Sequence, residues 1–69
     1  MMRWVARDMK NKKVLLVADT NQQALEDLSQ LVGPVVPIRV ESSVVEARLD
    51  CRNYDPSHMG YEIRYEFRE

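Results

Sequence analysis

Strict alternation of apolar and charged residues near the end of the sequence constrains the fold more than any other feature. Two runs, residues 45–52 and 61–68, change from apolar to charged at every step. Successive side chains of a β-strand point to opposite faces of a sheet, so a period of two predicts two half-buried strands. The apolar residues of both runs, which form the predicted inner face, are Val45, Ala47, Leu49, Cys51, Ile63, Tyr65 and Phe67.

A helix is the alternative for the first of these runs. Ser43 followed by Glu46 has the pattern of a capping box. On a helix, however, Arg48 and Arg52 would share a face with the apolar residues. The periodicity therefore favours a strand, and the two runs together predict an antiparallel hairpin.

The charges on the outer face of this hairpin predict its register. In one antiparallel register, every charged residue of one strand lies opposite a residue of the other sign. The pairs in that register are Arg52–Glu62, Asp50–Arg64, Arg48–Glu66 and Glu46–Arg68. Because each cross-strand pair is worth only about 0.2–1 kcal/mol, we expect these charges to determine register more than stability.

An amphipathic helix is predicted over residues 21–32. Thr20 is a suitable N-cap, and Gln23 completes a capping box. Gly33 and Pro34 end the helix, because glycine adopts the left-handed conformation and proline cannot continue the hydrogen bonding. The apolar stripe consists of Ala24, Leu25, Leu28, Leu31 and Val32. One helix with one apolar stripe is expected to lie on one face of a sheet.

Three other segments are predicted to be strands. Residues 1–9 favour a strand over a helix because they contain Trp4 and Val5. The continuous apolar run 14–18 indicates a strand that is central or covered on both faces. Residues 35–41 form a strand that Pro37 restricts to an edge or to one-sided pairing. The residues expected to face inward are Met2, Trp4 and Ala6 in the first segment, and Val36, Ile38 and Val40 in the last.

The connections complete the predicted fold. A turn is expected over residues 8–13, with Asn11 able to adopt the left-handed conformation. Ser42 and Ser43 form either a turn or a bulge in one long bent strand, and Gly60 permits an unusual backbone angle after the loop 53–60. The predicted class is α+β: a single helix, about residues 21–32, on one face of a mostly antiparallel sheet of three to five strands in the order ββαββ(β).

Length and composition indicate a single small domain, residues 1–69. The sequence has no apolar run long enough to span a bilayer, so no membrane partner is expected. It also has no signal-peptide core near Met1, and its single cysteine, Cys51, cannot form an internal disulfide. These features predict a cytoplasmic protein.

The sequence offers no recognisable catalytic, metal or cofactor motif. His58 is the only histidine, and one histidine with one cysteine cannot complete a zinc site. Two glycines, Gly33 and Gly60, do not make a glycine-rich phosphate loop. We therefore expect a non-enzymatic protein that binds no cofactor.

Protein binding is the leading functional hypothesis, because the predicted domain is small and combines a charged sheet face with a free strand edge and an exposed loop. The expected contact residues are Arg48, Arg64, Glu66 and Arg68 on the sheet, with Tyr54, His58 and Met59 in the loop. The predicted architecture is similar to that of several very small phage-encoded inhibitors, including inhibitors of bacterial RNA polymerase and of CRISPR effectors. That resemblance covers the architecture alone and implies a large host complex as the partner.

Nucleic-acid binding through the first thirteen residues is the alternative. This segment has a net charge of +4 on a chain of net charge −1, and Trp4 lies among its cations. Basic residues interleaved with an aromatic residue are typical of surfaces that grip phosphates and stack a base. The candidate residues are Arg3, Arg7, Lys10, Lys12 and Lys13. A homodimer formed through an edge strand is a third possibility.

Overall fold

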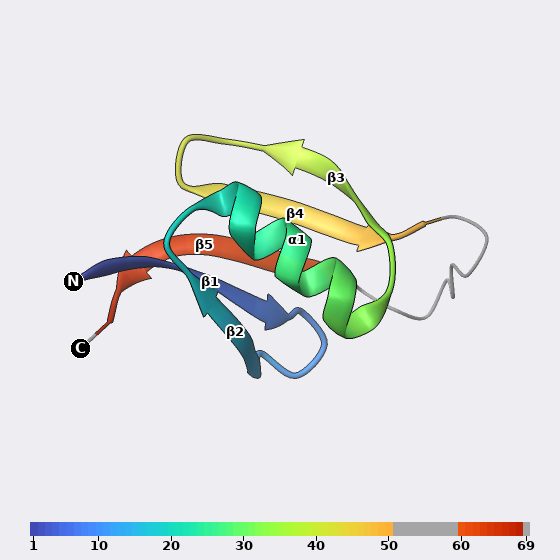
Figure 1. Cartoon of the computed structure of the whole chain (residues 1–69), viewed down its shortest axis with the longest axis horizontal. Coiled ribbons are helices and arrows are strands. Elements are labelled where there is room, and N and C mark those ends of the chain that lie inside the picture. Colours follow the sequence, from blue (N-terminus) through green and yellow to red (C-terminus); the bar gives the residue numbers. More distant parts are fainter. Residues whose placement is uncertain (51–59, 69) are drawn as a thin grey trace.

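A computed structural model describes residues 1–50 and 60–68 and shows one helix packed on a five-stranded antiparallel sheet within them (Figure 1). The elements in chain order are β1 (Met2–Asp8), β2 (Val14–Ala18), α1 (Asn21–Val32), β3 (Val35–Val40), β4 (Val44–Leu49) and β5 (Tyr61–Phe67). The predicted α+β class and a single helix on one face of the sheet are confirmed. The strand segment at the start of the chain is confirmed as well.

The sheet has the strand order β2-β1-β5-β4-β3, so the first and last strands of the chain lie side by side in its centre. Met2 is opposite Phe67 at one end of this pair, and Asp8 is opposite Tyr61 at the other. The backbone N–H of Arg68 also donates to the carbonyl oxygen of Met1 at 2.7 Å. The two chain ends therefore meet at the same end of the molecule (Figure 1).

The helix has the bounds that the sequence predicts. Thr20 caps it, since the Thr20 hydroxyl accepts a hydrogen bond from the Gln23 N–H at 3.1 Å. At the other end, the Gly33 N–H donates to the Ser29 carbonyl at 3.0 Å. Leu28 is fully buried, and burial of such a side chain contributes about 1.5–3 kcal/mol. The helix covers residues from β1, β2, β4 and β5, and its main buried cluster consists of Ala6, Ala18, Ala24, Leu28, Val45, Tyr61 and Ile63.

The prediction that the apolar run 14–18 is central or covered on both faces is wrong, because β2 is an edge strand. Within β2 only Ala18 is fully shielded from solvent. The strand next to it, β1, lies in the interior of the sheet between β2 and β5 and buries a side chain on each face: Ala6 under the helix and Val5 on the opposite face. A strand can therefore be central without being apolar throughout, provided that its charged residues are paired.

Strand β3 lies at the other edge, as Pro37 predicts, and residues 41–43 form a turn into β4. The prediction that Val36 faces inward is wrong. Pairing with β4 becomes irregular between Pro37 and Arg39, and this irregularity reverses the facing of the residues before it. Val36 therefore lies opposite Arg48, on the face away from the helix. Ile38 and Val40 remain substantially exposed, because the helix does not extend over this edge.

Strands β4 and β5 form the predicted antiparallel pair, but the predicted register is wrong. Val45 lies opposite Ile63, and Glu46 lies opposite Glu62 rather than Arg68. The observed register buries Val45, Ala47, Tyr61 and Ile63 together on the helix side. The predicted register would place the same residues on the helix side, because the two registers differ by an even number of residues. What decides between them is therefore not the exposed ion pairs, which are worth at most about 1 kcal/mol each.

The charged residues of β5 find other partners: Glu66 binds Arg7 of β1, and Arg64 binds Glu62 within β5. Glu66 is opposite Arg3 of β1, whereas Arg48 of β4 is opposite Val36 of β3. The predicted Arg48–Glu66 pair therefore does not form, and Arg64 is opposite Val44 rather than Asp50. Glu62 is opposite Glu46, and its predicted partner Arg52 lies outside the described residues.

Candidate functional site

The face of the sheet away from the helix carries a network of ion pairs. Arg7 donates two hydrogen bonds of 2.6 Å to the two carboxylate oxygens of Glu66. Along the strands this bridge spans the position of Val5 and Arg64, which lie opposite one another. Val5 has no exposed surface, although it lies on the face that the helix does not cover. We conclude that long charged side chains shield Val5 from water.

The same network changes the proton affinity of its carboxylates. The hydrogen bonds from Arg7 lower the pKa of Glu66, and this effect exceeds the opposing effect of burial. Similarly, hydrogen bonding from Arg64 lowers the pKa of Glu62. Both carboxylates therefore stay ionised to a lower pH than a free glutamate. They are not suited to act as general acids near neutral pH.

Further ion pairs neutralise most of the outer face. Arg3 lies 3.0 Å from the carboxylate of Asp19, and Arg39 pairs with Glu41 and more distantly, at 3.8 Å, with Glu46. Of the residues predicted to contact a partner, Arg64 and Glu66 already have partners within the chain. Arg48 lies on the same outer face, and Arg68 follows the end of β5.

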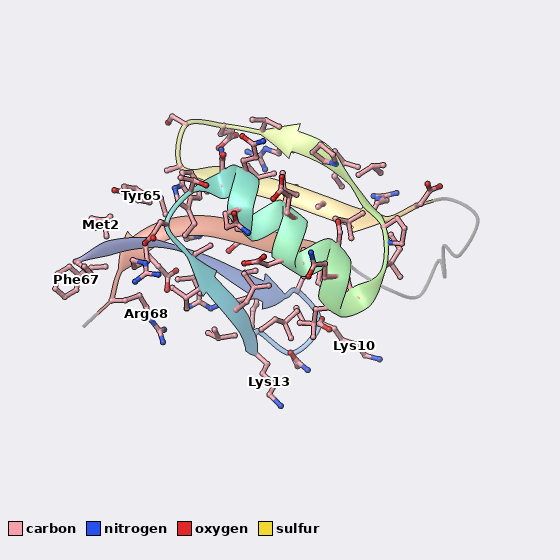
Figure 2. The ribbon with its side chains drawn as sticks, in the orientation of Figure 1. Met2, Lys10, Lys13, Tyr65, Phe67 and Arg68 are labelled. Carbon is pink, nitrogen blue, oxygen red and sulfur yellow. The ribbon has the colours of Figure 1, made fainter. Side chains whose placement is uncertain are left out.

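The five candidate nucleic-acid-binding cations do not form one surface. Arg3 and Arg7 lie within β1 and are held by carboxylates on the outer face. The other three, Lys10, Lys12 and Lys13, are in the turn that connects β1 to β2. Figure 2 shows Lys10 and Lys13 along the lower edge of the molecule, in the turn at the far end of β1 from Met2. The structure therefore separates the candidate cations into two groups with different environments.

The turn itself is built differently from the sequence-based expectation. The left-handed residue is Lys12, with φ of 64°, rather than Asn11. Asn11 instead accepts a hydrogen bond from the Lys13 N–H at 2.8 Å, and Asp8 accepts one from the Lys10 N–H at 2.8 Å. Side-chain acceptors thus hold a compact turn and direct its lysines outward. The predicted contact residues Tyr54, His58 and Met59, and the predicted inward residue Cys51, lie outside the described residues.

The most distinctive exposed surface is apolar and lies at the end of the sheet where β1 begins and β5 ends. Met2, Tyr65 and Phe67 are exposed to 46%, 40% and 68%. Met2 is opposite Phe67, and Trp4 is opposite Tyr65, so all four occupy adjacent positions on the helix-side face. Figure 2 shows Met2, Tyr65 and Phe67 projecting from the same end. We refer to Met2, Tyr65 and Phe67 as the apolar end.

The prediction that Tyr65 and Phe67 belong to the core is wrong for a geometric reason. A helix of 12 residues is about 18 Å long, whereas a strand of 7 residues such as β5 spans about 23 Å. The helix also crosses the sheet obliquely (Figure 1). The last inward-facing positions of β5 therefore extend past it. Comparing the two predicted lengths is the sequence signal that could have identified this exposed surface.

Trp4 fixes the base of the apolar end. Its ring centroid lies 4.9 Å from that of Tyr65, with the planes tilted by 37°. This distance is typical of favourable aromatic pairs, which contribute about 0.5–1.5 kcal/mol beyond the area they bury. Trp4 also packs against the buried cluster under the helix. Tyr65 is therefore held by a partly buried ring, whereas Phe67 projects beyond it.

The described residues contain no other recognisable kind of site. They enclose no pocket, and they include no group of three or more side chains able to hold a metal ion. No helix in the described part of the chain has the length and apolar character needed to cross a membrane. The apolar end, the ionic outer face and the lysine turn are thus the surfaces from which a function can be inferred.

Comparisons with known proteins do not indicate a further candidate site. No known protein-family model matches the chain, and comparisons with curated proteins and with solved structures gave no significant match.

Proposed function

We propose that this chain is a non-enzymatic protein-binding module whose contact surface is the apolar end. The single observation that supports this proposal is the contiguous exposure of Met2, Tyr65 and Phe67 on one face. Contiguous apolar patches, unlike scattered apolar residues, are typical of interaction sites. Aromatic residues and methionine are also enriched in protein interfaces.

The contribution of these residues to the fold does not explain their character. Phe67 keeps two thirds of its surface exposed and is not among the residues packed against the buried cluster. A polar residue at this position would cost the fold little and would remove an aggregation risk. A partner that covers the ring would account for the exposed phenylalanine. An inhibitor that acts on a larger complex, like the small phage-encoded inhibitors of similar predicted architecture, is the specific form of this proposal.

Nucleic-acid binding has less support from the geometry. Its proposed surface requires five cations and Trp4 together, but Arg3 and Arg7 are neutralised by Asp19 and Glu66. The lysine turn alone offers few phosphate contacts, and affinity for nucleic acid grows with their number. The test of protein binding must therefore distinguish it from binding to nucleic acid.

The experiment is quantitative affinity purification from the cells in which the protein is made, with three forms of the chain. These are the original sequence, Phe67→Ser, and Leu31→Ser as a matched control. Leu31 is exposed to 57% but lies in the last turn of the helix, away from the apolar end. Nuclease treatment of every sample removes proteins that are bound through nucleic acid.

We expect a protein that is retained by the original chain and by Leu31→Ser, and that is lost with Phe67→Ser. Circular dichroism and urea unfolding establish that both variants are folded. The proposal is wrong if retention is equal for all three forms, or if retention disappears on nuclease treatment.

A further inference from the structure

We infer that the apolar end accepts a short acidic segment of a partner protein, with large apolar side chains placed on Phe67 and Tyr65 and a carboxylate placed near Arg68. This inference rests on the proposed function and adds the chemistry of the partner. Three observations support it: the size of the surface, the charge beside it, and the separation of the lysines from it.

The size of the apolar end suits a segment rather than a broad protein face. With 68% of Phe67 and 40% of Tyr65 exposed, and about 200 Å² for a whole aromatic side chain, the two rings expose roughly 200 Å². Including Met2, the surface is on the order of 300 Å², compared with about 800 Å² per partner in a standard interface. A single helix or extended strand covers such an area, whereas a stable dimer of this chain would need a larger surface.

A cation, Arg68, directly follows the apolar end in the chain. Arg68 is exposed, and Figure 2 shows its side chain directed away from the rings of Phe67 and Tyr65. It makes no ion pair with another described residue, although its charge contributes to the lowered pKa of Glu66. The neighbouring carboxylates are already engaged, because Glu66 is bound by Arg7 and Asp19 lies against Arg3. Among the described residues, Arg68 is thus an available cation at the border of the aromatic surface. A carboxylate in the partner complements it.

A single-stranded nucleic acid fits this surface less well than an acidic peptide does. Stacking platforms for single strands combine aromatic side chains with a positively charged groove that follows the backbone. Here Arg68 directly follows Phe67 in the chain, but Lys10 and Lys13 lie in the turn at the far end of β1 from Met2 (Figure 2). One available cation supports one carboxylate contact, not a phosphate track.

The experiment selects random peptides from a display library against the whole chain. No variant is used during the selection, so that dependence on Phe67 is measured only afterwards. The most enriched peptide is synthesised with a fluorescent label, in its original form and with its acidic residues changed to lysine. Both forms are titrated against the original chain and the variants Phe67→Ser, Arg68→Glu and Leu31→Ser.

We expect the selected peptide to contain large apolar residues next to aspartate or glutamate. Phe67→Ser should weaken its binding about tenfold or more, as for a central aromatic contact. Arg68→Glu should weaken it about threefold, the scale of an exposed ion pair, and should improve binding of the lysine form. Leu31→Ser should leave both affinities unchanged.

Two results would separate this inference from the proposed function. If Phe67→Ser abolishes peptide binding but Arg68→Glu changes neither affinity, the protein-binding surface stands and the acidic partner is wrong. If no selected peptide depends on Phe67, both fail. The inference is also overturned if the chain dimerises in sedimentation, or binds single-stranded oligothymidine, in a way that Phe67→Ser abolishes.

Discussion

Gly60 is the residue on which the close approach of β4 and β5 most directly depends. It precedes β5 with a φ of 92°, and its carbonyl oxygen accepts a hydrogen bond from the Met9 N–H at 3.1 Å. A Cβ at this position would lie 2.8 Å from the carbonyl oxygen of Ala47. The glycine is therefore required both for its backbone angle and for its lack of a side chain.

Gly60→Ala should lower the free energy of unfolding by about 2 kcal/mol or more, because it combines backbone strain with a steric clash. Gly33→Ala is the matched control, since Gly33 also has a positive φ, of 102°, but no atom lies within 4 Å of its added Cβ. Urea unfolding of both variants measures the difference. Equal destabilisation would show that the contact with Ala47 is unimportant.

Glu66 should make stability dependent on pH. Because Arg7 lowers the pKa of Glu66 below its ordinary value of 4.5, the folded state binds a proton less readily than the unfolded state. The stabilisation is fully present above that ordinary value and is lost as the pH falls through the lower pKa of the folded state. Glu66→Gln should therefore cost about 1 kcal/mol at neutral pH.

Urea unfolding of the original chain and of Glu66→Gln, repeated from neutral pH into the acid range, tests this prediction. The two stabilities should converge as the pH decreases. Glu26→Gln, on the exposed side of the helix, serves as the control and should have little effect at any pH. A difference between the original chain and Glu66→Gln that does not change with pH would contradict the role assigned to the Arg7 bridge.

Among the elements, β1 contributes a fully buried side chain to each face of the sheet, Ala6 on the helix side and Val5 on the outer side. Val5→Ala should cost about 2 kcal/mol, because it removes buried methyl groups beneath the Arg7–Glu66 bridge. Val36→Ala, at an exposed position on the same face of β3, should cost less than about 1 kcal/mol. Thermal or urea unfolding gives both values. Similar costs for the two substitutions would mean that the outer face has no buried layer.

The helix could be predicted from the sequence to its exact bounds because its determinants are local. Thr20, Gln23 and Gly33 act within a few residues of the helix ends, and the apolar stripe needs only one covered face. The period of two likewise predicted the strands and the burial of Val45 and Ile63. These inferences required no knowledge of which strands are neighbours.

The register and the exposed surface could not be predicted in this way, because they depend on distant elements. The charges of β5 match those of β4 in one register, but β5 also pairs with β1, where Arg7 and Glu66 meet. The predicted register was based on the pairing of β4 with β5 alone and did not include the pairing of β5 with β1. Likewise, Tyr65 and Phe67 have the same pattern as buried residues, and only the placement of the helix leaves them exposed.

At the scale of the whole molecule, the central pairing of β1 with β5 joins the two ends of the described chain and should give the most stable part of the fold. Strand β3 pairs on one side only, and its pairing is irregular. Native-state hydrogen exchange should therefore show the slowest amides in β1 and β5 and the fastest strand amides in β3. Equal protection in β3 and β1 would contradict this order.

Site-specific photocrosslinking can show whether the apolar end contacts a protein inside cells. A benzophenone amino acid is placed at position 67 in one sample and at position 31 in another, and both are irradiated in cells. We predict a discrete crosslinked protein from position 67 that is absent from position 31. Crosslinking of both positions to the same mixture of proteins, or of neither position to any protein, would show that the apolar end is not a specific protein-binding surface.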